Sequence, residues 1–143
     1  MYSFRKSKKG FTLIELMVVV AIIGVLALLG LRLYTGQQEK AKNAIVKANA
    51  GTAQTLLQAN LADSTYSDAA TAVAALTGHG MRNPYLSAPL VIESVAGDTL
   101  PTNSTAAGAV VVCQVSLIPT EKYLIGGYDG LKAKVGEELT AQK

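Results

Sequence analysis

Residues 8–24 read KKGFTLIELMVVVAIIG and place a single carboxylate, that of Glu15, inside a run that is otherwise apolar. From Phe11 to Leu31 the only polar side chains are those of Thr12 and Glu15. A helix over this stretch is about 31 Å long, which is enough to cross the hydrocarbon core of a bilayer. The stretch therefore predicts a membrane-spanning helix, and any account of the chain has to explain Glu15.

The distribution of charge predicts an orientation for this helix. Four basic residues precede it, so the positive-inside rule places the N-terminus in the cytoplasm and residues 32–143 outside. They are Arg5, Lys6, Lys8 and Lys9. The alternative is an ordinary secretory signal, which is less well supported because the apolar run is long and no small-x-small cleavage site follows it.

The same four residues explain the net positive charge. The formal net charge is +3, but without residues 1–10 nine basic side chains stand against ten acidic ones. No basic face with interleaved aromatic residues is present in the remainder, so the sequence predicts no specific nucleic-acid partner.

The helical pattern continues beyond Leu31. Residues 32–62 contain no proline, and an apolar stripe follows the i, i+3, i+4 spacing of an amphipathic helix. The stripe is formed by Ile45, Ala48, Thr52, Leu56 and Ala59. We predict one helix from about Phe11 to about Ala62, roughly 75 Å long. The alternative is a separate second helix after a hinge at Gly36, although one glycine costs only about 1 kcal/mol within a helix.

Glu15 requires a partner, because a charged carboxylate in lipid is costly unless it is paired or protonated. No basic residue lies within one turn of it on the same helix. We therefore expect the partner to come from another molecule or to appear after processing. A cut between Gly10 and Phe11 would create an α-amino group four residues before Glu15, which could pair with the carboxylate of a neighbouring copy. It would also remove the four leader charges.

These residues resemble the N-terminal signature of type IV pilins and the related pseudopilins. The shared features are a short basic leader ending in Gly10, then Phe11, Thr12, and Glu15 at the fifth position after the cut. The resemblance is specific over residues 8–31. It implies that a prepilin peptidase and N-methyltransferase cuts after Gly10 and methylates the amine of Phe11. It also implies that Glu15 neutralises the Phe11 amine of an adjacent subunit.

The resemblance further implies a place and a set of partners. The chain would be a single-pass protein of the cytoplasmic (inner) membrane, with its N-terminus in the cytoplasm, and then part of an extracellular pilus. A membrane assembly platform and an ATPase would build the helical homo-oligomer. The chain would be a structural subunit with no catalytic role.

The chain departs from the family pattern in two places. Many members carry a proline near the end of the apolar run, where this chain has Gly30-Leu31-Arg32. Because glycine weakens a helix, we expect any unwinding to lie between Gly24 and Gly30. Second, Cys113 is the only cysteine, so the C-terminal disulfide of many Gram-negative pilins cannot form. The head must then be held by packing and hydrogen bonds.

Residues 63–143 predict a small globular head. Ala69–Leu76 is alanine-rich and reads as a short helix capped by Ser67 or Asp68. Strands are expected over residues 90–95, 109–115, 123–128 and 131–135, with an Asp129-Gly130 turn joining the last two. We predict an α+β fold in which a three- or four-stranded antiparallel sheet packs on the long helix, as in the pilin fold.

The exported part shows no pattern typical of catalysis, metal binding or cofactor binding. His79 is the only histidine. The acidic residues Asp98, Asp129, Glu137 and Glu138 do not have the alternating spacing of a calcium loop. We therefore expect no enzyme, no metal and no cofactor.

Two functions fit the resemblance. The first is a subunit of a type IV pilus used for adhesion, twitching motility or DNA uptake. The second is a pseudopilin of a type II secretion or competence system, forming a short periplasmic or cell-wall pseudopilus. The leader and helix do not separate them, and the 81-residue head and weak calcium pattern favour the first. A membrane-anchored enzyme or receptor would leave Glu15 unexplained.

Overall fold

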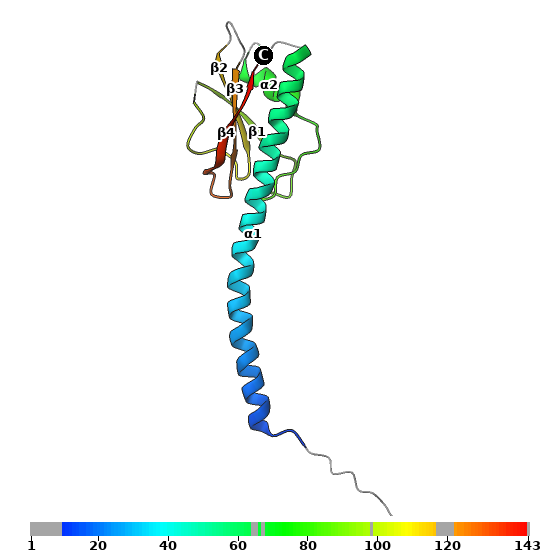
Figure 1. The fold of residues 1–143 in the computed structure, drawn as a ribbon, viewed down its shortest axis with the longest axis vertical. Helices are drawn as coiled ribbons and strands as arrows, with labels where there is room; N and C mark the ends of the chain where they lie inside the picture. Colours follow the sequence, from blue (N-terminus) through cyan, green and yellow to red (C-terminus); the bar gives the residue numbers. More distant parts are fainter. Residues whose placement is uncertain (1–9, 64–65, 67, 98, 117–121, 143) are drawn as a thin grey trace, which may run out of the picture. The chain divides into compact units, whose positions relative to one another are not determined.

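The computed structural model describes residues 10–63, 66, 68–97, 99–116 and 122–142 (Figure 1). Residues 1–9, which contain the four basic residues of the expected leader (residues 1–10), lie outside the described residues. The elements in chain order are α1 (Leu13–Asp63), α2 (Ala69–Leu76), β1 (Ile92–Ala96), β2 (Val110–Ser116), β3 (Lys122–Tyr128) and β4 (Lys134–Gln142). The chain divides into two compact units, one ending at Gln38 and the other beginning at Glu39. Helix α1 contributes to both.

Helix α1 confirms the prediction of one long helix, since it is continuous through Gly36. Every residue of α1 up to Gln38 is exposed, and its large apolar side chains are 44–73% exposed. By length and composition this half is able to cross a membrane. An apolar helix with no buried side chain needs lipid or other helices around it, because water is a poor solvent for all of its faces.

The second half of α1 packs in the head through a different stripe from the one predicted. The buried residues are Val46, Ala50, Ala53, Leu57 and Leu61, whereas Ile45 is 47% exposed. The predicted stripe was therefore wrong in phase by about one residue. The sequence carries adjacent apolar residues at 45–46 and 56–57, so two neighbouring stripes have helical spacing. The observed one ends in Leu61, which adds a large side chain to the core.

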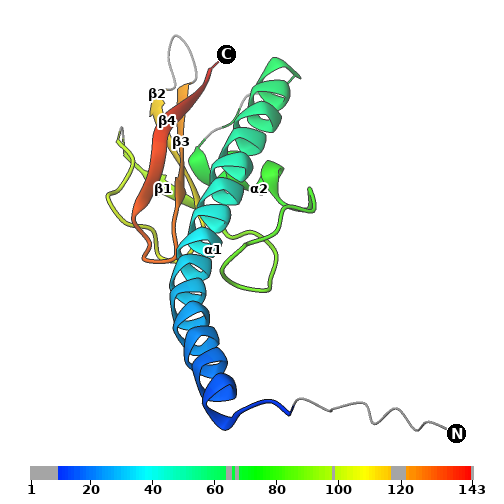
Figure 2. The ribbon, with the colours of Figure 1, turned by 60° about the horizontal axis from the view of Figure 1, so that its bottom comes forward.

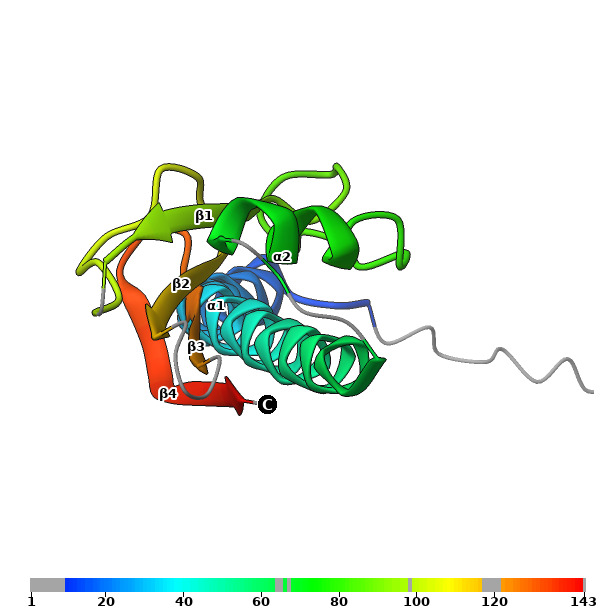
Figure 3. The ribbon, with the colours of Figure 1, turned by 90° about the horizontal axis from the view of Figure 1, so that it is seen from above.

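The sheet has the order β1-β2-β3-β4 and curves around the second half of α1 (Figures 2 and 3). The pairs β2–β3 and β3–β4 are antiparallel, as expected. The expectation was wrong for β1, which pairs parallel to β2, so the sheet is mixed. A parallel neighbour needs a long connection rather than a tight turn. The segment from Gly97 to Ala109 provides it.

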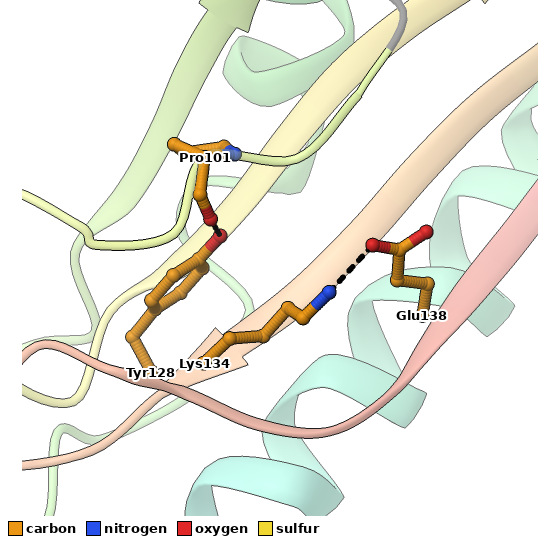
Figure 4. Close-up of polar contacts among 4 residues, drawn as sticks. All are labelled: Pro101, Tyr128, Lys134 and Glu138. Carbon is orange, nitrogen blue, oxygen red and sulfur yellow. Dashed lines mark hydrogen bonds and ion pairs between the residues drawn. The ribbon is translucent and has the colours of Figure 1, made fainter.

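The connection between β1 and β2 is held by side chains. Glu93 accepts hydrogen bonds from the backbone N–H groups of Thr105 at 3.0 Å and Ala106 at 2.9 Å. The Tyr128 hydroxyl donates to the Pro101 carbonyl at 2.6 Å (Figure 4). Burial raises the pKa of Tyr128 to about 12, so the hydroxyl keeps donating even at a pH at which an ordinary tyrosine would ionise.

Two apolar clusters stabilise the head on opposite faces of the sheet. The larger one joins the buried stripe of α1 to Leu76 of α2 and to Val112, Tyr123 and Ile125 of the sheet. The smaller one contains Leu100, Val111, Cys113 and Tyr128. Cys113 is a buried, free thiol. Packing on both faces of the sheet therefore stabilises the head, as expected from the lone cysteine.

Side chains of α1 pair with the outer edge of β4. The Gln58 amide nitrogen donates to the Gln142 carbonyl at 2.6 Å, and the Gln142 N–H donates to the Gln58 side-chain oxygen at 3.1 Å. The Gln54 amide nitrogen donates to the Thr140 carbonyl at 2.8 Å. These amides take the place of a further strand, which protects part of an edge that would otherwise be open to pairing.

A prediction concerns Gly127, where β3 meets α1. A Cβ atom there would lie 2.7 Å from Val46 Cγ1 and 3.2 Å from the Val46 carbonyl oxygen. We expect Gly127→Ala to lower the free energy of unfolding of the head by about 1–3 kcal/mol, because the sheet must move away from the helix. Thermal unfolding of the full chain in detergent, followed by circular dichroism, measures this.

The matched control is Gly51→Ala in the same half of α1. A Cβ atom at Gly51 meets no atom within 4 Å. Alanine there should raise stability by up to about 1 kcal/mol through helix propensity. Equal melting temperatures for the Gly127 variant and the unaltered chain would contradict the close contact between β3 and α1.

Candidate processing and assembly site

The candidate site lies at the N-terminal end of α1, where Thr12 immediately precedes the first helical residue. The Thr12 backbone N–H donates to Glu15 Oε2 at 2.9 Å, and the Thr12 hydroxyl donates to the same oxygen at 2.8 Å. In return the Glu15 N–H donates to Thr12 Oγ1 at 3.3 Å. This reciprocal arrangement is a capping box, in which each side chain satisfies a backbone donor of the other residue.

The capping box gives Glu15 a role within its own chain. A carboxylate in the first turn also interacts favourably with the helix dipole. The sequence analysis considered only a cation as the partner of Glu15 and did not predict its hydrogen bonds with Thr12. The spacing Thr-x-x-Glu before an apolar run would have revealed it. The sequence analysis expected a partner from another molecule or after processing, and it did not include the hydrogen bonds from Thr12 of the same chain. The external cation stays a prediction.

A counter-charge for Glu15 is a separate matter. In the parts of the chain that the structure describes, one ion pair is present, between Lys134 and Glu138 at 2.6 Å (Figure 4). Among the residues that the structure describes, both hydrogen bonds to the Glu15 carboxylate come from Thr12 and end on Oε2.

Gly10 and Phe11 precede the helix and are both exposed, Phe11 by 79%. A Cβ atom built on Gly10 meets no atom within 4 Å. The fold of this chain therefore does not require glycine at position 10.

Gly24 and Gly30, expected to be points of flexibility, both lie inside α1. A Cβ atom at either position meets no atom within 4 Å. The helix is continuous through both residues. Unwinding of the helix between Gly24 and Gly30 in an assembled filament stays a prediction.

Other polar residues named in the sequence analysis form hydrogen bonds within the head. The Asp129 carboxylate accepts hydrogen bonds from the N–H groups of Leu131 at 2.8 Å and Ala133 at 3.0 Å, which shapes the turn before β4. His79 Nε2 lies 3.2 Å from the Ala75 carbonyl oxygen. Asp98 lies outside the described residues. Among those described, no three metal-ligating side chains form a group.

Comparison with known proteins places the same N-terminal residues in a family. Residues 5–31 match the family model described as the prokaryotic N-terminal methylation motif. Fimbrial protein EcpB of Eikenella corrodens is 47% identical over 55 residues, which cover 38% of this chain and 35% of that protein. No solved structure matches the chain.

The matched residues and the fold agree with each other. The methylation motif covers residues 5–31, which include the apolar part of α1. The rest of the chain forms the small α+β head expected behind such a helix. The N-terminal motif, the partial similarity to a fimbrial protein and the α+β fold together support a type IV pilin.

Proposed function

We propose that this chain is a structural subunit of a type IV pilus, which polymerises through the apolar half of α1 after residues 1–10 have been removed. The observation that carries the proposal is the fully exposed apolar helix joined to a packed head. Such a helix is stable in a bilayer before assembly and in a bundle of like helices afterwards. The head stays in water in both states.

The first stage of the proposal is processing at the membrane. The leader cations hold the N-terminus in the cytoplasm, and a prepilin peptidase cuts between Gly10 and Phe11. The same enzyme methylates the new amine of Phe11. The exposure of both residues outside α1 supports this step, because a peptidase requires an accessible peptide bond.

The second stage is assembly, in which Glu15 pairs with the Phe11 amine of a neighbouring copy. Either charge alone in a low-dielectric bundle is costly, whereas the pair offsets much of that cost. The capping box supports this step, since it holds the Glu15 carboxylate in place through Oε2. A membrane platform and a cytoplasmic ATPase would supply the work of extraction.

The fimbrial relative favours a pilus over a pseudopilus, although the match covers about a third of either protein. Adhesion, twitching motility and DNA uptake are the uses to which such a filament would be put. The alternative is a pseudopilin of a type II secretion or competence system, whose short filament would not extend from the cell.

The deciding experiment is the intact mass of this protein in material sheared from the surface of native cells. We expect long filaments that contain a chain beginning at methylated Phe11. A processed chain found only in the membrane fraction would favour the pseudopilin or a scarce minor subunit. A chain that still carries its leader in every fraction would contradict the proposal.

A further inference from the structure

We propose that Arg32 and Tyr34 form a depth anchor, which binds the phosphate region of phospholipids and fixes the position of α1 in the membrane before assembly. The proposal rests on the membrane-embedded stage of the proposed function. The two residues close the apolar half of α1, where many family members carry a proline.

The first observation is the setting of Arg32. Its neighbours Leu31 and Leu33 are 63% and 72% exposed, and Arg32 itself is exposed. Within the described part of the chain, Arg32 takes part in no ion pair. A guanidinium between leucines at the end of an apolar helix extends its long side chain toward the membrane surface, because hydrocarbon solvates the charge poorly. Lipid phosphate is the anion present at that depth.

The second observation is the placement of Tyr34 relative to Arg32. Two residues along an α-helix correspond to about 3 Å of rise and about 200° of rotation. The side chains therefore leave the helix at one level but on opposite sides. A contact with a single protein partner would use one side of the helix, whereas headgroups surround it. Tyr34 is 64% exposed, and tyrosine is enriched at membrane interfaces.

A third observation concerns the surface beside Arg32. A shallow and mostly apolar hollow is lined by Leu28, Leu29, Leu31, Arg32 and Thr35. A phosphate held by Arg32 would place the acyl chain of the same lipid along the leucines of this hollow. Both ends of a phospholipid therefore find complementary chemistry on one face of the helix.

The anchor has a consequence for the other end of the helix. Nineteen residues separate Leu13 from Arg32, a rise of about 28 Å, while the hydrocarbon core is about 30 Å thick. With Arg32 at one surface, the Gly10–Phe11 bond lies at the other. Glu15 then lies only a few residues inside that surface, where a carboxylate is less costly than at the bilayer centre. The anchor therefore keeps the cleavage site accessible.

The test uses the full chain in phospholipid vesicles. The sequence contains no tryptophan, so Tyr34→Trp creates a single fluorescent reporter at the anchor. Lipids brominated at shallow or deep positions of the acyl chain quench the reporter according to its depth. We expect stronger quenching by the shallow bromines. Adding Arg32→Leu should reduce the ratio of shallow to deep quenching by about twofold, because the helix end sinks without its charge.

The control is Arg32→Lys combined with the same Tyr34→Trp substitution, which keeps the cation and should leave the ratio unchanged. Flotation of the vesicles is measured for each variant. If all variants float and Arg32→Leu leaves the ratio unchanged, the anchor is wrong and the membrane stage stands. If the unaltered chain does not float with the vesicles, both the anchor and the membrane stage of the proposed function are wrong.

Discussion

We expect filaments to be lost when Glu15 is replaced by alanine, while cleavage between Gly10 and Phe11 continues. The reason is the Phe11 amine of the neighbouring copy, which is left without its counter-charge inside the bundle. Breaking one partner of a buried ion pair costs about 3–5 kcal/mol, so the yield of filaments should fall at least about 100-fold. The yield is measured as the amount of this protein sheared from cells, and cleavage as its mass in the membrane fraction.

Because Glu15 also takes part in the capping box, two further variants are needed to distinguish its charge from its role in capping the helix. Glu15→Gln keeps a side-chain oxygen that can accept from the Thr12 N–H but removes the charge. Thr12→Val removes the hydroxyl that bonds to Glu15 and keeps the carboxylate. Loss of the cap costs about 1 kcal/mol, a much smaller effect than loss of the pair.

If pairing drives assembly, Glu15→Gln fails as Glu15→Ala does, and Thr12→Val retains most filaments. If capping is the essential role, Glu15→Gln assembles and Thr12→Val fails. Normal filaments formed by Glu15→Ala alone would refute the pairing role, because that variant has no carboxylate. It would also show that the Glu15 half of the capping box is dispensable, since only the bond from the residue 15 N–H to the Thr12 hydroxyl remains.

The long helix was predictable because its determinants are local. Residues 32–62 lack proline, and the apolar run before them admits no other regular structure of that length. The short helix Ala69–Leu76 was likewise predictable, and Asp68 caps it by accepting from the Thr71 N–H at 2.8 Å. Which face of α1 enters the core was not predictable, because tertiary packing chooses between two adjacent apolar stripes.

The sheet was less predictable at its two edges. Strand β1 is short, and its parallel pairing depends on the distant contacts of Glu93 and Tyr128 that hold its connection to β2. Strand β4 was expected over residues 131–135 but runs from Lys134 to Gln142. Its sequence is polar, and it is stabilised by pairing with β3 and by the amides of Gln54 and Gln58. Such partners are far away in sequence.

The start of β4 was misplaced for a local reason. The two-residue turn expected at Asp129-Gly130 extends to Ala133, because the Asp129 carboxylate accepts from two later N–H groups. Lys132 adopts a positive φ of 67° within this turn. A non-glycine residue in that conformation is uncommon, so sequence patterns do not anticipate it.

Replacing Gly10 with leucine should leave the leader on the chain and abolish filaments. The Gly10 side of the cut is exposed, and a Cβ atom there meets nothing, so the fold itself tolerates the change. Retention of the leader would therefore reflect the fit of residue 10 to the peptidase. The intact mass of the protein in the membrane fraction measures it, and Gly10→Ala is the smaller control, expected to be cleaved more slowly or normally.

The uncut chain should fail to assemble for two physical reasons. It has no Phe11 amine to pair with Glu15, and it keeps the four leader charges, each of which costs about 2.5–3.5 kcal/mol at the centre of a membrane helix. A processed protein of normal mass from Gly10→Leu would show that the cleavage site lies elsewhere. Together with Glu15→Ala, which should be cut but not assembled, this variant would establish that processing precedes and permits assembly.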